Sequence, residues 1–443
     1  MGIRLAKSLG MGIVSALFVN FAPGLRADET NLLGSVNMSL PRFWNAVENR
    51  PGPVSVVAFG DSLQIPHRSL CKYLFASLAA EIGQAGHSFS WPPAISNPDL
   101  TGGASWSAYT VVDGYWWMQY LVMPPSSVVT WNSGQANGVT RCDSIGLYYG
   151  VGPEGGQIQI DVATNGGVWL PKQVVDTHHD TNETRYARWQ LPLGYYKMRV
   201  QSLTGITNRV LGPEMLNSHS NGISTAYLWH DGVNLRNILS LPPQVLHPVL
   251  SNLHPDLIVW HMKELADLGE SSLSNELERL EVLWKNVAPA TEVIYIGTPY
   301  DATDATKVHT EIQNRLVRSL ALRNGRCYVD CMTPFGSYSQ MVTNGYLDDH
   351  VHINNLGYAF MNTLVWDQLC FEALRQDRRL VAQGTLAAPV LSFQSFSNVE
   401  HVLQTSSNLW QWNDGPSIAG DGNRRTITNP PAQSPVYFRM LLR

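Results

Sequence analysis

The sequence predicts an α/β fold: a parallel β-sheet covered on both faces by helices, interrupted by an inserted antiparallel β-sandwich and followed by a small C-terminal β module. Three observations predict it. Strand-like and helix-like segments alternate from about residue 40 and again from about residue 222, which is typical of a parallel sheet. Residues 142–203 instead read as short alternating strands between Gly, Asn and Asp turns. After residue 379 the chain becomes polar and β-rich again.

The apolar run 54–59 predicts the first strand, and the helical spacing of apolar residues at 68–82 predicts the first helix. Later strands of the parallel sheet are expected at 257–260, 292–296 and 327–329, and later helices at 274–286, 308–323 and 358–374. Strands of the insertion are expected at 144–149, 157–161, 185–191 and 196–202. Because 443 residues exceed one ordinary core, we expect several domains. They are an α/β domain in two parts (28–125 and 215–382), the insertion (126–214) and the C-terminal module (383–443).

Residues 1–27 read as a secretory signal peptide. Arg4 and Lys7 form its basic start, residues 11–19 its apolar stretch, and Leu25-Arg26-Ala27 a plausible cleavage end. No later run approaches the ~20 apolar residues of a membrane span, so we expect an exported protein, secreted or periplasmic, with no integral membrane segment after signal cleavage. The net charge of −5 and the lack of a basic block argue against a nucleic-acid partner.

Five cysteines in an exported protein leave at least one unpaired. Cys71 and Cys370 lie in the first and last helices predicted for the α/β domain, and a disulfide between them is one hypothesis. Cys327 and Cys331 lack the further Cys and His residues of a zinc site, and we expect them to pack around a strand end.

A serine follows the first predicted strand directly, in Gly60-Asp61-Ser62. Glycine after a buried strand predicts a tight turn that presents Ser62 at the start of a helix, where free backbone N–H groups favour developing negative charge. This is a suitable position for a nucleophile. The alternative is a strand–turn–helix with an incidental serine.

The catalytic partners of Ser62 are expected in the segment 348–357, near the C-terminal end of the α/β domain. Asp349 and His352 are three residues apart, so one turn can bring the carboxylate against the imidazole. In this hypothesis Ser62 attacks an acyl carbon, His352 acts as base and then acid, and Asp349 orients His352. The chemistry requires neither a metal nor an organic cofactor. The alternative is an ordinary polar loop.

These segments resemble the SGNH/GDSL hydrolase family. The matching runs are Phe59-Gly60-Asp61-Ser62 and Asp349-His350-Val351-His352-Ile353-Asn354-Asn355-Leu356-Gly357, with a weaker match from Gly222-Ile223-Ser224 to His230-Asp231-Gly232. The resemblance implies a three-layer flavodoxin-like α/β/α fold and hydrolysis of esters, often acyl groups on carbohydrate. The insertion looks like that of peptidoglycan O-acetylesterases and acetylxylan-type esterases, where it is similar to a carbohydrate-binding module. By the same resemblance, the backbone N–H groups of Ser62 and Gly232 would stabilise the oxyanion.

The chain departs from the family in its third motif, Gly-x-Asn followed by Asp or Glu, whose Asn donates to the oxyanion. The corresponding residues 257–267 contain neither the glycine nor the asparagine. Losing one such donor typically lowers turnover by ~10²–10³. His261 and Lys263 are the nearest residues with N–H donors, and a cationic Lys263 could take the role. The alternative is an ordinary ion pair of Lys263 with Glu264 or Asp267.

Other polar clusters have alternative interpretations. His350 and His352, beside Asp348 and Asp349, could form a metal site, although the hydrolase motif accounts for this segment better. The run His178-His179-Asp180 is expected to be a solvated loop of the insertion.

The chain has 14 tryptophans, which could either stack on sugar rings or pack in the core. Trp106 and the run Tyr115-Trp116-Trp117 fall near the start of the insertion, whereas Trp410 and Trp412 are expected to cap the small core of the C-terminal module.

Together these features predict an exported serine esterase that removes O-acyl groups, most simply acetyl, from a polysaccharide or cell-wall glycan. An acylated carbohydrate is the expected partner. One alternative is a carbohydrate-binding protein with little or no turnover on the same scaffold. Another is a lipase or thioesterase, which would need a long apolar groove.

Overall fold

The computed structural model describes residues 14–15, 40–64, 69–89, 99–106, 120–133, 141–164, 166–229, 234–263, 269–300, 304–378, 381–385, 388–394, 400–406, 413–419, 424–428 and 437–442. The chain divides into two compact units. One comprises Leu33–Trp366, and the other comprises Met1–Leu32 together with Asp367–Arg443.

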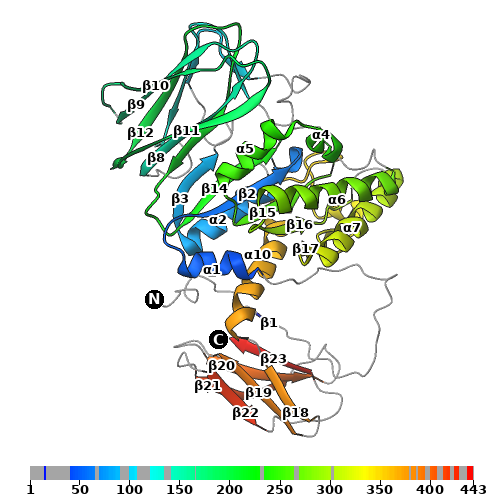
Figure 1. Ribbon diagram of the computed structural model, residues 1–443. Coiled ribbons are helices and arrows are strands. Elements are labelled where there is room, and N and C mark those ends of the chain that lie inside the picture. The colour runs from blue at the N-terminus through cyan, green and yellow to red at the C-terminus, as the bar shows by residue number, and fades with distance from the viewer. Residues whose placement is uncertain are drawn as a thin grey trace. The chain divides into compact units, whose positions relative to one another are not determined.

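The larger unit is built on a parallel sheet (Figure 1). Its strands are β2 (Val54–Gly60), β14 (Ile223–Trp229), β15 (Leu257–His261), β16 (Glu292–Ile296) and β17 (Cys327–Val329), with β3 (Gln84–Phe89) parallel to β14 at its outer side. The spatial order of these parallel strands is β3-β14-β2-β15-β16-β17. The prediction of a mixed α/β fold with a parallel sheet is therefore confirmed.

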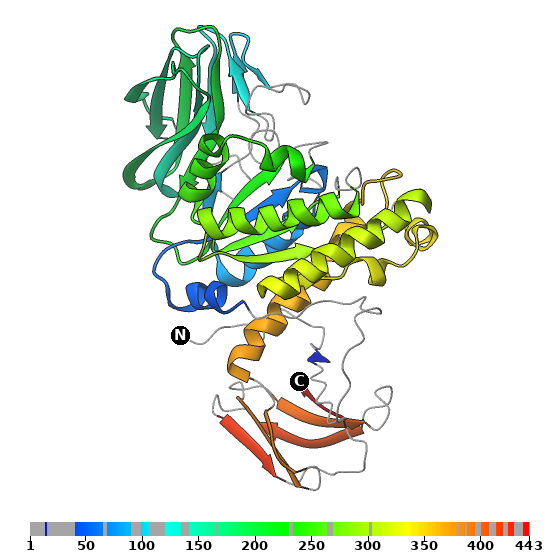
Figure 2. The ribbon, with the colours of Figure 1, turned by 45° about the vertical axis from the view of Figure 1, so that its right-hand side comes forward.

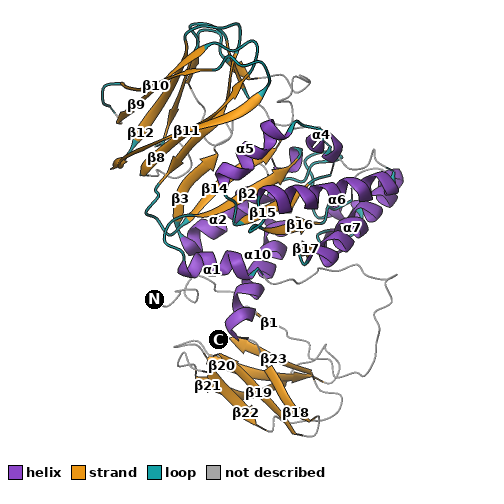
Figure 3. Cartoon of the chain, viewed as in Figure 1, coloured by secondary structure: helices purple, strands orange, loops and turns teal. Residues whose placement is uncertain are grey.

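Helices occur at the four predicted ranges (Figure 3). These are α2 (Leu70–Ile82), α6 (Glu270–Val287), α7 (Asp304–Asn324) and α10 (Asn355–Arg378). Five further helices among the described residues are not expected from the sequence: α1 (Pro41–Asn49), α4 (Leu235–Leu239), α5 (Pro243–Leu253), α8 (Met332–Phe335) and α9 (Tyr338–Thr343). In α6 the buried residues Leu273, Leu277, Leu280 and Trp284 recur at helical spacing. The Trp284 ring packs edge-on against Phe59 of β2 at 5.0 Å, which fixes α6 on the strand that precedes Ser62.

The insertion is a two-sheet sandwich, one sheet of which continues the parallel sheet (Figure 2). Strand β13 (Asn208–Leu216) pairs antiparallel with β3, and β8 (Cys142–Val151) and β11 (Glu183–Gly194) follow it. The second sheet contains β10 (Leu170–Asp176), β9 (Gln157–Thr164), β12 (Tyr196–Ser202), β7 (Val128–Asn132) and β4 (Asp99–Thr101). The short strands β5 (Ser105–Trp106) and β6 (Leu121–Met123) pair with each other, and β6 also pairs with β13. The insertion therefore shares backbone hydrogen bonds with the sheet that carries Ser62.

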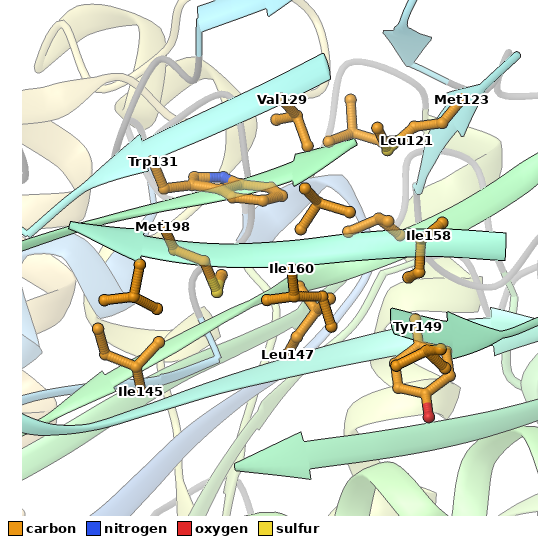
Figure 4. Packing of buried hydrophobic residues seen from close by; sticks show 14 of the residues in the cluster. Leu121, Met123, Val129, Trp131, Ile145, Leu147, Tyr149, Ile158, Ile160 and Met198 are labelled. Carbon is orange, nitrogen blue, oxygen red and sulfur yellow. The ribbon is translucent and has the colours of Figure 1, made fainter. Parts of the chain in front are cut away.

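A single apolar core holds the two sheets of the insertion together (Figure 4). Alternate residues of each strand point inward, as Met198 and Val200 do in β12 and Ile145 and Leu147 do in β8. Trp131 is almost fully buried among them. Burial of this alternating set explains why residues 142–203 form a sandwich and not further α/β units.

The smaller unit is β-rich, as the sequence predicts. One sheet contains β18 (Val381–Thr385), β19 (Ala388–Gln394) and β22 (Arg424–Thr428). The other contains β1 (Val14–Ser15), β23 (Tyr437–Leu442), β20 (Glu400–Ser406) and β21 (Asn413–Ala419). The proposed signal peptide, apart from these two residues of β1, lies outside the described residues, as do Trp410 and Trp412.

The hypothesis of a Cys71–Cys370 disulfide is wrong, because Cys71 is a free, buried thiol. It lies in the apolar stripe of α2 with Leu74 and Leu78, and burial holds its pKa well above the usual range, despite a hydrogen bond with Gln64. Cys327 is the first residue of β17 and Cys331 lies two residues after its end, and both are buried. Among the described helices, none is both long and apolar enough to span a membrane.

Candidate active site

Ser62 lies in a tight turn directly after β2. The strand ends at Gly60, where a Cβ atom would lie 1.9 Å from the carbonyl oxygen of His261, so only glycine permits this approach of β15. Ser62 then begins a three-residue 3₁₀ turn, held by hydrogen bonds from the N–H groups of Leu63 and Gln64 to Asp61. Ser62 therefore starts a helical turn, as expected, although the turn is a 3₁₀ turn, and the helix expected at 68–82 is α2, which begins at Leu70.

The segment with the candidate acid/base histidine is a narrow hairpin that leads into α10. Residues Leu347 and Ile353 form a bridge, and the Asn354 side chain donates to the carbonyl oxygens of Gly345 and Leu347. The Asn354 Oδ1 atom also accepts the N–H of Gly357, which caps the first turn of α10. The motif that resembles the hydrolase family thus folds the loop and fixes where its histidine lies.

The structure brings the three predicted residues into one line of contacts. Ser62 Oγ lies 3.4 Å from His352 Nε2, and His352 Nδ1 lies 2.8 Å from Asp349 Oδ2. The other carboxylate oxygen, Asp349 Oδ1, accepts the backbone N–H groups of Val351 and His352, both at 2.7 Å. The carboxylate is therefore fixed by the same loop that carries the imidazole.

Electrostatics favour an ionised Asp349. Burial acts to raise the pKa of its carboxyl, but hydrogen bonds from the His352 backbone and ring and from the Val351 N–H outweigh it, so the pKa lies well below its usual range. An ionised Asp349 keeps the proton of the neutral ring on Nδ1. The lone pair of Nε2 then faces Ser62, which is the arrangement that a general base needs.

Three residues are predicted to stabilise the oxyanion: Ser62, Gly232 and Lys263. Ser62 lies in the 3₁₀ turn after β2. Gly232 lies outside the described residues, so its predicted role remains a prediction. Lys263 follows β15 and is half-buried, and its backbone N–H donates to Asp61 Oδ2. Glu264 and Asp267, the alternative ion-pair partners of Lys263, also lie outside the described residues.

His261, the other donor candidate, is fully buried. Burial, reinforced by the nearby charge of Lys263, lowers the pKa of its ring to about 3, so the ring is neutral at physiological pH. Because the His261 side chain is fully buried, it cannot contact a substrate carbonyl.

The structure does not bring the His350 and His352 rings together as a metal site. The His350 ring lies 3.3 Å from the hydroxyl of Tyr338, whereas the His352 ring lies between Ser62 and Asp349. Within the described residues, no group of three or more His, Cys, Asp or Glu side chains is arranged to hold a metal ion.

In the insertion, His178 and Asp180 are exposed in a loop, as expected. The run Tyr115-Trp116-Trp117 lies outside the described residues, and of Trp106 only the backbone is described.

No sequence pattern indicates a role for Asp61, Thr298 or Gln313, which together hold the backbone at the end of β15. A weak signal exists for Thr298, because polar residues just after a parallel strand lie at the edge where ligands bind. Gln313, in the middle of α7, gives no such signal.

No family model matches this chain, and no curated protein matches it. Among solved structures, it is similar to a peptidoglycan O-acetylesterase at 13% identity, covering 75% of this chain and 95% of the other, with a TM-score of 0.59. An acetylxylan esterase from Geobacillus stearothermophilus is 16% identical over 34% of this chain and 75% of its own, with a TM-score of 0.28. A family two carbohydrate esterase from Clostridium thermocellum is 10% identical over 63% of this chain and 98% of its own, with a TM-score of 0.26.

The fold assignment rests on the first of these similarities. The chain shares the fold of the peptidoglycan O-acetylesterase, and its resemblance to SGNH/GDSL hydrolases is confirmed at that level.

Proposed function

We propose that this protein is an exported serine esterase that removes O-acyl groups, most simply acetyl, from a polysaccharide or cell-wall glycan. One observation carries the proposal: the line of contacts from Ser62 through His352 to Asp349. It lies beyond the C-terminal end of β2, next to β15, the edge of a flavodoxin-like sheet at which ligands bind. The three-layer arrangement of such folds is part of the proposal.

In the acylation step, Ser62 Oγ attacks the ester carbonyl carbon while His352 Nε2 takes the hydroxyl proton. The imidazolium is stabilised by ionised Asp349 and then gives its proton to the departing sugar oxygen. Water activated by the same imidazole hydrolyses the acyl-enzyme, releasing the carboxylic acid and restoring Ser62. The 3.4 Å separation of Ser62 Oγ and His352 Nε2 is long for this transfer, and such contacts often tighten when substrate binds.

Negative charge on the tetrahedral intermediate needs donors at the same edge of the sheet. In this proposal they are the backbone N–H groups of Ser62 and Gly232 and the ammonium group of Lys263. The chemistry uses no metal or organic cofactor.

The choice of a glycan substrate is supported by the insertion and by the fold shared with a peptidoglycan O-acetylesterase. Because β13 pairs with β3, the sandwich is joined rigidly to the sheet that carries Ser62. A rigid sandwich is suited to position a polymer beside the nucleophile. Export is proposed from the sequence of residues 1–27.

The test is release of acetate from p-nitrophenyl acetate and from a panel of O-acetylated glycans by the mature protein, Ser62→Ala and Ser271→Ala. The last is a matched control, since Ser271 is exposed on α6. We expect glycan deacetylation by the mature protein and the control, and none by Ser62→Ala. Activity that survives in Ser62→Ala would contradict the proposal.

A second candidate is a glycan-binding protein with little turnover. It is favoured by the missing Gly-x-Asn motif and by the hydrogen bond that occupies the Lys263 backbone N–H. This candidate predicts glycan binding without ester cleavage in the unmodified protein.

A further inference from the structure

One peptide unit at the end of β15, between Met262 and Lys263, is held at both of its polar groups. Its carbonyl oxygen accepts Gln313 Nε2 at 2.9 Å and Thr298 Oγ1 at 3.3 Å. Its N–H donates to Asp61 Oδ2. Asp61, Met262, Thr298 and Gln313 are each at most 4% exposed. Rotation of the peptide would leave buried polar groups unsatisfied, so its orientation is fixed.

The same Asp61 carboxylate also holds the turn that contains Ser62. Its Oδ1 atom accepts the N–H of Leu63 at 3.0 Å, while Oδ2 accepts the N–H of Lys263. The missing Cβ of Gly60 lets β15 approach closely enough for this bridge. One buried carboxylate therefore sets the position of the nucleophile turn relative to Lys263.

This arrangement decides which group at the end of β15 is able to donate to an oxyanion. The Lys263 N–H is occupied by Asp61. The His261 ring is fully buried, and neither of its nitrogens has a hydrogen-bond partner among the described residues. Of the three side chains at 261–263, only that of Lys263 is both a nitrogen donor and partly exposed.

We propose that Asp61, Thr298 and Gln313 are positioning residues, which lock the Met262–Lys263 peptide so that the Lys263 ammonium group replaces the missing asparagine as an oxyanion donor. The inference rests on the proposed esterase function. A hydrogen bond from an ammonium group to an oxyanion is stronger than one from a neutral amide, so a cation is a chemically adequate substitute. Thr298 and Gln313 act only through Lys263 and make no contact with substrate.

The test is a double-mutant cycle on Lys263→Met and Gln313→Leu, with kcat and KM measured for p-nitrophenyl acetate. Lys263→Met should lower kcat by ~10²–10³, as loss of one oxyanion donor does, with KM little changed. Gln313→Leu should lower kcat by roughly tenfold, since a positioning error of about 1 Å alone has effects up to 10². In the Lys263→Met background, Gln313→Leu should cause no further loss, because the group that it positions is absent.

A matched control is Gln368→Leu, the same exchange at a buried glutamine of α10 that makes no hydrogen bond to Met262. Its kcat should equal that of the unmodified protein. If Gln313→Leu does not fold, Thr298→Val takes its place in the cycle, since it removes only the 3.3 Å bond to the Met262 carbonyl. Lys263→Arg, which keeps a cationic donor, should retain more activity than Lys263→Met.

The inference is overturned if the losses of Lys263→Met and Gln313→Leu multiply independently, or if Lys263→Met has the kcat of the unmodified protein while Ser62→Ala has none. The latter result leaves the esterase intact and removes only the role of Lys263. Activity that persists in Ser62→Ala instead overturns the proposed function itself, so the two failures are distinguishable.

Discussion

His352 and Asp349 are joined twice: the ring Nδ1 of His352 lies 2.8 Å from Asp349 Oδ2, and its backbone N–H donates to Asp349 Oδ1 at 2.7 Å. Both oxygens of one carboxylate are thus used within four residues of chain. The orientation of the imidazole is set inside the loop and does not depend on an element packed from elsewhere. The proposed acid/base residue and its orienting group are therefore held together by one loop.

Replacing Asp349 by Asn should lower kcat by roughly 10³–10⁴, as in serine hydrolases whose orienting carboxylate becomes an amide. The amide leaves the loop its shape but no longer stabilises the imidazolium or fixes the proton on Nδ1. Asp348→Asn is the control, because the side chain of Asp348 is exposed and contacts neither ring nitrogen of His352. The kcat of both variants is measured by steady-state kinetics with p-nitrophenyl acetate. An equal fall in kcat in Asp349→Asn and Asp348→Asn would contradict the prediction.

The depressed pKa of Asp349 also predicts how stability depends on pH. Its hydrogen bonds favour the charged form, so their contribution is present above the unfolded pKa of ~3.9 and is lost as pH falls towards the lower folded pKa. The Asp349 side chain is 52% exposed, so solvent screening limits the contribution to about 1 kcal/mol or less. Urea unfolding of the unmodified protein and Asp349→Asn should give different free energies at pH 7, and the difference should shrink only as pH falls below ~3.9. A difference that grows on acidification would contradict this.

The sequence predicts several strands and the three catalytic candidates, but not every local turn. Strands 292–296, 327–329 and 196–202 are predicted at the observed bounds, since short apolar or alternating runs end at turn residues. Ser62, Asp349 and His352 follow from their chemistry and local spacing. The 3₁₀ form of the turn at Ser62 does not, because it is held by the Asp61 carboxylate and carbonyl, and no sequence pattern indicates those contacts.

The bridge from Asp61 to Lys263 could not be predicted either. It joins residues 202 positions apart, and it exists only because β15 lies next to β2 in the sheet. Gln313 reaches Met262 across 51 positions, from a helix whose pattern indicates only an amphipathic surface. Strand order, and not local sequence, creates these contacts.

The core of the insertion should stabilise the whole larger unit, because β8 connects through β13 and β3 to the parallel sheet. Leu147→Ala, at a fully buried position, should lower the free energy of unfolding by about 2–5 kcal/mol. Leu170→Ala, at a position 59% exposed, should change it by less than ~0.5 kcal/mol. Tryptophan fluorescence and esterase activity, followed in urea, should be lost in one transition. Separate midpoints for the two signals would show that the insertion unfolds independently.

Gly357 should be required for the position of His352. A Cβ atom there would lie 2.3 Å from Ile353 Cγ2 and 2.6 Å from the carbonyl oxygen of Tyr346, so alanine must push the hairpin away from α10. We expect Gly357→Ala to lower the free energy of unfolding by about 1–3 kcal/mol, the usual effect of overpacking. Its kcat should fall by at least ~10-fold, since an error of about 1 Å in a catalytic group has effects of up to 10².

The matched control for Gly357→Ala is Gly269→Ala at the start of α6. The space around Gly269 is open, and its φ of −55° suits any residue, so this variant should match the unmodified protein in stability and kcat. Thermal unfolding and p-nitrophenyl acetate kinetics on both variants make the comparison. Full activity in Gly357→Ala would mean that the loop tolerates the displacement, and that the contact between His352 and Ser62 does not depend on close packing of the hairpin against the first turn of α10.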